Sequence, residues 1–432
     1  MATIRVSTSA DREEPASNPV LRSAPCCLPA AEGTSMTSPI IVAGGGIAGL
    51  TVALSLLRQG RQVIVLEQTR AIGDVGAGIS LGARTSRALY ALGIEAALKA
   101  VSDTPQGSAA FDYRTGEVLG GAYARRNWSA ADMADVNMLH RADLFDVLKA
   151  AIDAIDPQAV RLGHRLERYE QDEAGVTVHL SDGDILSGSV LIGADGLRST
   201  VRSQMTGEVT PRATGRVAYR FLVPMAQAAP FMGAGPAGIY VGSRVALGRY
   251  VIRKGTLVNC VAFAHRPDVS SESWSQRATR DELMALFDGW HPDVRGLASA
   301  APLERTARWA LYDRDPLDTW IDGRVTLIGD AAHPLIPFLG LGAAMGVEDA
   351  IIMARAFAQW PEPAQALDVY QRARTGRANA ILLESRRQAE VFDAGPGATN
   401  DMPDAERESR VDYDPLTVAL PQPWQTCPDK QP

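Results

Sequence analysis

The sequence predicts an α/β fold in which a Rossmann-like dinucleotide-binding domain is interleaved with a second unit built on a β-sheet. The first observation behind this prediction is a glycine-rich strand–turn–helix segment at 39–59, followed at once by another apolar strand. The second is a series of alternating, strand-like runs between 206 and 307. The third is the return of strand-and-turn segments at 190–202 and 324–345, which indicates that separate pieces of chain build the first domain.

The segment at 39–67 has the form of a βαβ unit. Its apolar run Pro39–Ala43 breaks at glycines and continues into a helical pattern over 50–59. A second apolar strand, Gln62–Leu66, ends at Glu67, and an acid in this position suits a ribose 2′-hydroxyl. Because strand, turn, helix, strand and acid follow in this order, the segment indicates a dinucleotide site. An incidental glycine-rich loop is the weaker alternative.

Three glycines in the turn follow the spacing G-x-G-x-x-G, and each suits one task. Gly44 allows the tight turn, Gly46 lets the backbone approach a pyrophosphate, and Gly49 lets helix and strand pack closely. Ile47 and Ala48 lead into the helix, whose N-terminus offers free N–H groups and a partial positive charge to the phosphates. These five residues are the first candidate cofactor contacts.

Another apolar strand, Arg324–Asp330, lies far along the chain. It ends in Gly329 and Asp330, and a glycine-rich turn at 340–345 and a helical pattern over 346–360 follow it. An aspartate at a strand end, beside a helix opened by glycines, can bind ribityl hydroxyls while the helix N-terminus faces the electron-rich edge of a flavin. The alternative for such an aspartate is a helix cap.

Three further motifs lie between these two segments. Val190–Arg202 contains a strand, a Gly-Ala-Asp-Gly turn and a helix start, His140–Leu144 reads H-R-A-D-L, and Gly76–Ser80 begins G-A-G-I. Together with Gly329–Asp330, they resemble the DG, HRADL, GAGI and GD motifs of the class A flavoprotein aromatic hydroxylases. That group contains salicylate hydroxylase, 3-hydroxybenzoate 6-hydroxylase and 6-hydroxynicotinate 3-monooxygenase. The matches follow the family's order from about 38 to 390.

The resemblance implies a glutathione-reductase-like FAD-binding domain with an interleaved β-sheet substrate domain, as in p-hydroxybenzoate hydroxylase. On this basis we expect a discontinuous FAD-binding domain at 37–105, 139–205 and 308–394, and a substrate-binding domain at 106–138 and 206–307. The residues implied to contact FAD, beyond the first glycine-rich turn, are Glu67, Gly78, Arg141, Asp195, Gly329, Asp330, Gly342 and Ala343.

The resemblance also implies the reaction. NADH or NADPH would reduce FAD, O2 would add at flavin C4a, and the hydroperoxide would hydroxylate a small aromatic or N-heteroaromatic ring bearing hydroxyl and carboxylate groups. The cofactor carries the oxygen chemistry, and no metal-ligand spacing occurs among the six histidines. Two alternatives stay open. One is a flavin-dependent reductase or dehydrogenase of the same fold that inserts no oxygen, and the other is a flavin-binding regulatory protein with an inactive site.

Substrate and catalytic contacts are expected on the strands of the second unit. Tyr219 and Arg220 form one adjacent pair, and Arg249 and Tyr250 form another. Because neighbouring residues of a strand face opposite sides, at most one of each pair can point toward a substrate. The expected roles are an aromatic shelf and a partner for the substrate's anion or hydroxyl, and the alternative is packing or a surface salt bridge.

Other candidates come from the turns beside the flavin. His333 follows Gly-Asp-Ala-Ala, where an imidazole close to the reactive edge suits a proton relay, and shaping the turn is its alternative role. Pro337 and Phe338 are expected to line the same wall. Ser80 follows the GAGI turn, where some relatives carry a histidine that faces substrate, and a turn hydrogen bond is the favoured alternative.

Two positions depart from the family's pattern. Leu341 stands where relatives usually carry the glutamine of Gly-Gln-Gly, so a hydrogen-bonding side chain is lost while the backbone amides remain. Arg84 ends Gly82–Ala83–Arg84, where relatives often read Gly-Pro-Asn, and it adds a cation for a substrate carboxylate. Both differences predict a substrate other than salicylate.

Length and composition describe an ordinary globular protein. The 432 residues are many for a single core, and 46% of them are hydrophobic and 22% charged. The net charge of -7 disfavours nucleic acid and anionic membranes as partners, and no apolar run is long enough for a transmembrane helix. Four cysteines, two of them adjacent, favour reduced thiols in a cytoplasmic protein over a disulfide or zinc framework.

The two ends of the chain differ from the rest in composition. Residues 1–36 are rich in Ser, Ala, Pro and charge, so we expect a disordered extension, or a true start at Met36 in place of Met1. Residues 395–432 are expected to form a C-terminal tail over the surface. The stretch 364–391 carries Arg and Glu at helical spacing, which favours a solvated charged face. We expect a monomer or a homodimer.

Overall fold

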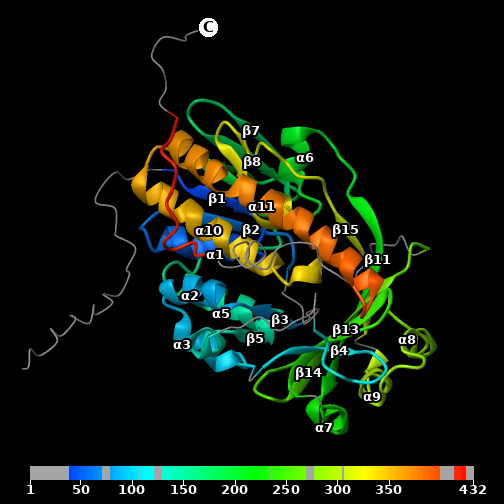
Figure 1. Ribbon diagram of the computed structural model, residues 1–432. Coiled ribbons are helices and arrows are strands. Elements are labelled where there is room, and N and C mark those ends of the chain that lie inside the picture. Colours follow the sequence, from blue (N-terminus) through cyan, green and yellow to red (C-terminus); the bar gives the residue numbers. More distant parts are fainter. Residues whose placement is uncertain are drawn as a thin grey trace, which may run out of the picture.

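Two six-stranded β-sheets, two smaller sheets and the helices around them make up the described structure, which is a computed structural model of the chain (Figure 1). The described residues are 38–70, 78–105, 107–120, 129–233, 235–268, 277–303, 306–398 and 413–424. The expected extension at 1–36 lies outside these residues, and so do Gly76 and Ala77 of the GAGI motif. Of the expected tail, only 395–398 and 413–424 are described.

The first sheet is the Rossmann-like core that the glycine-rich segment predicts. Its strands are β1 (Ile40–Ala43), β2 (Val63–Glu67), β6 (Val160–Leu162), β10 (Val190–Gly193), β16 (Ile321–Asp322) and β17 (Val325–Leu327). They lie in the order β16-β17-β10-β1-β2-β6, and of these six β16 alone runs antiparallel to its neighbour. β1 and β10 are buried along their whole length, which is why both read as unbroken apolar runs.

The carboxyl ends of the parallel strands bring the motifs to one edge of this sheet. β1 ends at Ala43, directly before the glycine-rich turn. β10 ends at Gly193, two residues before Asp195, and β17 ends at Leu327, two residues before Gly329. Ala43 pairs with Gly193, and Gly193 pairs with Leu327. Three segments that are distant in sequence therefore meet at the edge where open α/β sheets bind ligands.

Helices from both halves of the chain cover this sheet. α1 (Ile47–Leu57) packs against α10 (Gly342–Gln359) and α5 (Arg141–Asp153), and α10 packs against α11 (Pro363–Ala394). Figure 1 shows α10 and α11 lying across the sheet, with α11 continuing toward the second sheet, where it contacts β13. The shorter helices near α5 and α10 are α2 (Ala83–Ala91), α3 (Glu95–Val101) and α4 (Ala130–Ala134), whereas α6 (Thr200–Thr206) packs against β7 and β10.

The second sheet confirms the alternating strands that the sequence predicts between 206 and 307. Its strands are β4 (Ala109–Asp112), β11 (Arg212–Pro224), β12 (Ala237–Val241), β13 (Val245–Ile252), β14 (Leu257–His265) and β15 (Ala307–Asp313). They lie in the order β15-β11-β14-β13-β12-β4 and are antiparallel except for the pair β4–β12. β15 had been expected mostly within the first domain, at 308–394, but it pairs with β11 and so extends this sheet.

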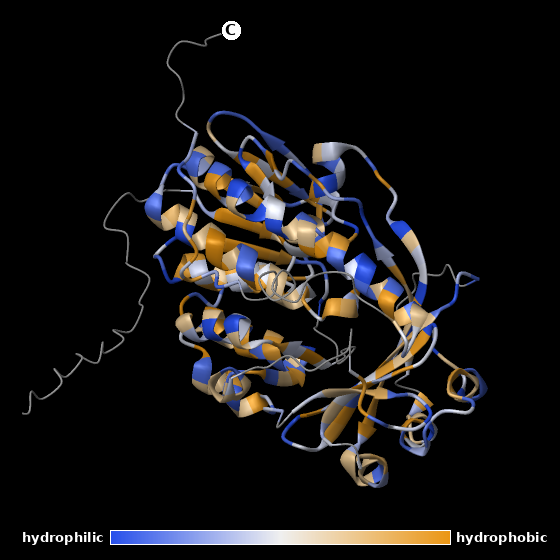
Figure 2. Cartoon of the chain, viewed as in Figure 1, coloured by the Kyte–Doolittle hydropathy of each residue, from blue (hydrophilic) through white to orange (hydrophobic). Residues whose placement is uncertain are grey.

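The two faces of the second sheet have different partners. On the outer face lie α7 (Met225–Ala228), the 3-10 helix η2 (Ala229–Phe231), α8 (Arg280–Leu286) and α9 (Pro292–Ser299). On the inner face lie β3 (Gly78–Leu81), β5 (Asn137–His140) and the 3-10 helix η5 (Pro337–Leu339). Figure 2 shows apolar residues along the strands of both sheets, as expected for sheets that are covered. The inner face therefore looks toward the ligand edge of the first sheet.

A third, smaller sheet forms around the turn Ser181–Gly183, which joins two antiparallel strands. It contains β7 (Leu166–Gln171), β8 (Val176–Leu180) and β9 (Ile185–Gly188), paired antiparallel in that order. Of the helices in the described part of the chain, none combines the length and apolar character needed to span a membrane.

Candidate flavin and substrate site

The glycine-rich turn has the shape that a bound pyrophosphate requires. Gly44 has a φ of +109°, and a Cβ built there would lie 2.3 Å from the carbonyl oxygen of Ala194. A Cβ at Gly49 would lie 2.0 Å from the carbonyl oxygen of Gly44. A Cβ at Gly46 would meet nothing within 4 Å, so the backbone there faces open space. The turn is thus closed at its first and third glycines and open at the second.

Glu67 lies against this turn at the end of β2. Its Oε2 accepts a hydrogen bond from the Gly45 N–H at 2.8 Å, and its Oε1 accepts from the N–H and hydroxyl of Thr69, both at 2.9 Å. A carboxylate has further lone pairs after these bonds, so a ribose hydroxyl can still bind. The role of Glu67 toward a ribose stays a prediction.

Asp195 follows β10 at the same edge. Its Oδ2 accepts hydrogen bonds from the N–H groups of Thr200 at 2.7 Å and Val201 at 3.2 Å, at the start of α6. Its Oδ1 is buried and has no hydrogen-bond partner among the described residues. Burial raises the pKa of this carboxyl, and hydrogen bonds from Ser199 and the helix start oppose that rise. A buried oxygen without a donor fits a contact to a hydroxyl-bearing ligand such as the ribityl chain of a flavin.

Asp330 stands on a short turn opened by Gly329, whose φ is +58°. Its side chain is exposed, yet enough protein surrounds the carboxyl that desolvation raises its pKa, with His333 and Arg141 opposing the rise. The Asp330 carboxyl is thus accessible although other protein groups surround it, and we call its surroundings a recess. Arg141, the first residue of α5, is exposed beside it.

Two side chains from the inner face of the second sheet complete this recess. Burial lowers the pKa of Arg220, Tyr250 opposes that shift, and Arg141 adds to it, so these three groups lie near one another. The Arg220 guanidinium also stacks on the ring of Trp309 at 4.9 Å. A Cβ at Gly78 would lie 2.8 Å from a ring carbon of Tyr250, which places this ring at the GAGI turn. We call the space bounded by Asp330, Arg141, Arg220 and Tyr250 the flavin recess.

Tyr219 and Arg249 point away from the flavin recess, contrary to the catalytic role expected for them. Tyr219 is fully buried in the outer core, and its hydroxyl donates to Oε1 of Glu282 at 2.8 Å. Arg249 is 1% exposed and donates from Nη1 to the carbonyl oxygen of Gly235 at 2.5 Å. Strand alternation is the reason, because Arg220 and Tyr250 take the inner face of each pair.

The comparisons with known proteins decide what kind of protein has this site. A family model described as FAD binding domain matches residues 37–385. The 3-hydroxybenzoate 6-hydroxylase of Polaromonas naphthalenivorans (strain CJ2) is 36% identical over 375 residues, which cover 82% of this chain and 88% of that protein. This chain belongs to the family of FAD-dependent aromatic monooxygenases. FAD is its cofactor, NAD(P)H is its co-substrate, and the expected aromatic-ring hydroxylase fold is confirmed.

Solved structures of two other proteins agree with this fold. A salicylate hydroxylase substrate complex is 30% identical with a TM-score of 0.70, and the match covers 87% of this chain and 94% of that one. Klebsiella pneumoniae HpxO, complexed with FAD and uric acid, is 26% identical with a TM-score of 0.73, covering 88% of this chain and 94% of that one. The open face of Gly46 and the unpartnered oxygen of Asp195 fit the FAD that this fold holds.

His333 lies in the interior of the monooxygenase and does not reach the recess. Its ring is 1% exposed and packs on Trp320, with the ring centroids 5.2 Å apart. Its Nε2 lies 2.6 Å from Oδ2 of Asp349. The expected proton relay at His333 is therefore corrected to the alternative role of holding the turn, because a ring without access to a ligand cannot exchange a proton with it.

Arg84 has a partner that the sequence did not predict. Arg84 lies in the first turn of α2, close to the C-terminal segment. Its Nη1 lies 3.7 Å from Oδ2 of Asp414. The expected contact of Arg84 with a substrate carboxylate stays a prediction. Leu341, in the position of the usual glutamine, immediately precedes α10 and packs against the main core. Gly342 and Ala343 form the N-terminus of α10, so their contact with FAD stays a prediction.

The remaining predicted wall residues lie on the inner side. Phe338 belongs to η5, and its ring lies 4.8 Å from that of Phe263 on the second sheet. Pro337 opens the same short helix. Ser80 is two residues after Gly78 on β3, so it shares the face that Gly78 turns toward Tyr250. Their contacts with substrate stay predictions.

Two residues of the recess escaped prediction from the sequence. Asn259 on β14 is buried, and its Oδ1 accepts a hydrogen bond from the Gly78 N–H at 2.7 Å. It thereby ties the start of β3 to the second sheet across 181 positions of chain. Trp309 supplies the shelf under Arg220. The alternation of Ala307–Asp313 could have identified Trp309, whereas no sequence signal pairs Asn259 with Gly78.

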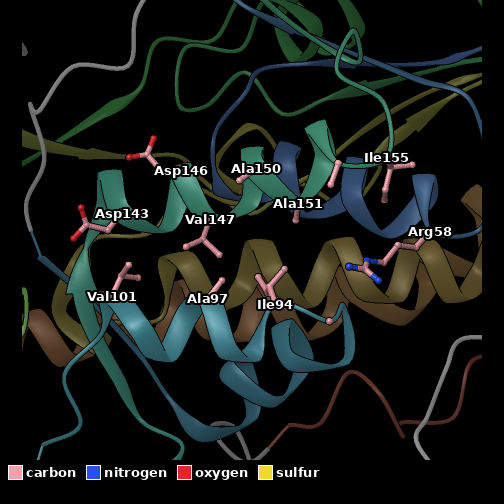
Figure 3. Close-up of a pocket in the computed structure, with 12 residues that line it drawn as sticks. Arg58, Ile94, Ala97, Val101, Asp143, Asp146, Val147, Ala150, Ala151 and Ile155 are labelled. Atoms are coloured by element: carbon pink, nitrogen blue, oxygen red, sulfur yellow. The ribbon is translucent and has the colours of Figure 1, made fainter.

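A separate groove of about 580 Å³ lies between α3 and α5, away from these motifs (Figure 3). Its wall is mostly small or aliphatic, as at Ala97, Val147, Ala150 and Ala151, and Arg58 stands near one end. No residue of the flavin recess lines it. This groove is therefore separate from the flavin recess, and its volume does not describe the place where substrate would react.

Proposed function

We propose that this monooxygenase hydroxylates a small, anionic aromatic ring that carries a hydroxyl and a carboxylate group. The observation that carries the proposal is Arg220. In the described part of the chain its guanidinium has no carboxylate within ion-pair distance, and burial lowers its pKa. Arg220 is half-buried, and its Nε is buried without a hydrogen-bond partner among the described residues. A cation in such a place is costly unless a ligand supplies an anion. A substrate carboxylate, or the negative edge of the reduced flavin beside it, meets that need.

The chemistry around Arg220 supports an aromatic ligand. Trp309 offers a flat face next to the guanidinium, and Phe338 with Phe263 adds an apolar wall. Burial raises the pKa of the Tyr250 hydroxyl far above its ordinary value, although Arg220 opposes that shift. Tyr250 therefore remains a protonated donor at neutral pH and can orient a phenolic or carboxylate oxygen of the substrate.

The residues of this chain divide the work between holding FAD and holding the ring. The glycine-rich turn, Asp195 and Asp330 hold the cofactor at the edge of the first sheet, and Arg220 and Tyr250 orient the substrate from the second sheet. FAD, reduced by NAD(P)H, supplies the oxygen chemistry when bound. The covered sheets keep water from the reacting atoms.

The relatives agree with this substrate class through their names, which specify 3-hydroxybenzoate and salicylate as compounds that those proteins act on. The deciding experiment uses FAD-loaded protein with NADH or NADPH, 18O-labelled O2 and a panel of hydroxylated benzoates and pyridine carboxylates. We expect a product that is heavier by one labelled oxygen, with matching NAD(P)H consumption. A product without labelled oxygen would instead establish the flavin reductase or dehydrogenase alternative.

A pair of matched substitutions tests which face of the sheet binds substrate. Tyr250→Phe removes a hydroxyl at the recess, and Tyr219→Phe removes a hydroxyl from the outer face. Because a hydrogen bond to a charged group contributes about 1.5–3 kcal/mol, we expect Tyr250→Phe to lower kcat/KM by roughly tenfold or more. Tyr219→Phe should leave kcat/KM unchanged and affect only thermal stability. Equal kcat/KM losses in steady-state assays of the two variants would contradict the assignment.

A further inference from the structure

The turn that carries Asp330 contains few side chains that could hold its backbone in place. We call residues Gly329–His333 the GD turn; between its ends lie one aspartate and two alanines. Within the turn, the N–H groups of Ala332 and His333 both donate to the carbonyl oxygen of Gly329 at 2.9 Å. Gly329 itself has a φ of +58°, in the left-handed region. The rest of its fixation must come from elsewhere in the protein.

Asp349 on α10 supplies one anchor. Its carboxylate is fully buried, and Oδ2 accepts hydrogen bonds from the Gly329 N–H at 2.8 Å and from Nε2 of His333 at 2.6 Å. Its Oδ1 accepts from Nε of Arg374 at 2.8 Å. Burial alone would raise the pKa of Asp349, but His333 and Arg374 outweigh it and lower the pKa to about 2. The Asp349 carboxyl is therefore ionised, and it hydrogen-bonds to both ends of the GD turn.

Arg202 on α6 supplies the second anchor from another side. Its Nη1 donates to the carbonyl oxygens of Ala331 at 3.1 Å and Ala332 at 2.9 Å, and the side chain is 6% exposed. Burial lowers its pKa to about 10, and Arg314 adds to that shift. The carbonyls that Arg202 binds lie in the middle of the turn, directly after Asp330. The GD turn is thus held at its ends by an anion and at its centre by a cation.

The long helix α11 takes part in this arrangement, which corrects the expectation of a solvated charged face at 364–391. Arg374 is fully buried and Glu384 is 3% exposed. Arg374 pairs with Asp349 through Nε and with Oε2 of Glu348 through Nη1 at 2.7 Å. Glu348 also receives Arg377 at 2.7 Å. The ion pairs of Glu348 go to Arg374 and Arg377 of α11, whereas Asp349 binds both Arg374 and the GD turn.

We propose that Asp349 and Arg202 are positioning residues for FAD, which hold the GD turn in the shape that presents Asp330 to the cofactor. Each acts through the turn itself: Arg202 binds the carbonyl oxygens of Ala331 and Ala332, and Asp349 binds the Gly329 N–H and the His333 imidazole. Buried ionic groups are costly and can be replaced by apolar packing, so their presence at this turn is better explained by geometry than by stability. The inference rests on FAD binding and is independent of the proposed substrate.

The test measures FAD affinity of the apoprotein, by quenching of flavin fluorescence, without any substrate. Asp349→Ala should weaken FAD binding by about ten- to a hundredfold, because loss of a charge-assisted bond frees the Gly329 N–H. Glu348→Ala is the matched control, since it removes a neighbouring acid from the same arginine network. It should lower the melting temperature comparably and leave FAD affinity within about twofold. The visible spectrum of bound flavin should change only in Asp349→Ala.

Substitutions of Arg202 give a second, independent test if the Asp349→Ala variant does not fold. Arg202→Met should weaken FAD binding to a similar extent, and Arg202→Lys should restore most of it, because an ammonium group can donate to the same two carbonyls. The proposal is overturned if Arg202→Met binds FAD as the unmodified protein does, or if Glu348→Ala loses as much affinity as Asp349→Ala. Neither outcome depends on turnover, so an error in the substrate class cannot imitate it.

Discussion

Replacing Gly46 by alanine is expected to weaken FAD binding by about a hundredfold while leaving the apoprotein folded. Gly46 has φ -71° and ψ -177°, an extended conformation that any residue adopts, and its added Cβ would meet no protein atom within 4 Å. The methyl group would instead occupy the space through which the pyrophosphate approaches the backbone. Titration of apoprotein with FAD, together with thermal melting, separates binding from folding.

Two other glycines serve as controls for this prediction. Gly376→Ala lies within α11 with nothing within 4 Å, so it should keep full FAD affinity and add up to about 1 kcal/mol of helix stability. Gly44→Ala combines a φ of +109° with a Cβ 2.3 Å from a carbonyl oxygen, so it should lower apoprotein stability as well as affinity. Wild-type affinity in Gly46→Ala would show that the turn does not hold the pyrophosphate.

The glycine-rich turn could be predicted from the sequence because each requirement is met by one residue at a fixed spacing. A positive φ at Gly44 and a backbone contact at Gly49 exclude side chains locally, and the flanking apolar strands are equally local signals. The strands of the second sheet followed from alternation for the same reason. A dinucleotide site was therefore derivable, whereas FAD as the dinucleotide was implied by the resemblance of the GD, DG, HRADL and GAGI motifs, and the family comparison confirms it.

The direction of side chains and their long-range partners could not be predicted in this way. Alternation states that Arg220 and Tyr219 face opposite sides, but the side that meets the flavin depends on β3 and β5, which are distant in sequence. The buried position of His333 could not be predicted because its partner, Asp349, comes 16 residues later in the sequence, after a turn whose shape the sequence does not specify. The pairing of Arg84 with Asp414 could not be predicted because Asp414 lies in the C-terminal segment.

The same limit applies to the charged residues of α11. At helical spacing, a row of Arg and Glu looks alike whether it meets water or buried partners, because the sequence does not show what packs against the helix. In the structure Arg374 meets two acids of α10, and Arg386 meets Asp313 of β15 at 2.8 Å. α11 therefore connects the first sheet's helices to the second sheet, and its charges help to fix how the two sheets face each other.

Arg220→Met is expected to raise KM for a carboxylated substrate by about a hundredfold, because a charge-assisted contact in a buried site is lost. The guanidinium is stacked on Trp309, so methionine retains much of the packing volume and removes the charge. Arg308→Met is the matched control. Arg308 lies on the neighbouring strand with its guanidinium on the outer face, 2.7 Å from Glu282, and its loss should leave KM unchanged.

A pair of ligands separates a carboxylate contact from a contact with the flavin. The unmodified enzyme should discriminate strongly between an aromatic carboxylate and its carboxamide, since the cation interacts with charge. Arg220→Met should bind the two nearly equally, with FAD affinity little changed, because the predicted cofactor contacts come from the first sheet's edge. If discrimination persists while FAD affinity falls, Arg220 serves the flavin, and the substrate carboxylate must bind at another cation. Arg141 is then the group to replace, because it is the other guanidinium whose charge acts on both Asp330 and Arg220.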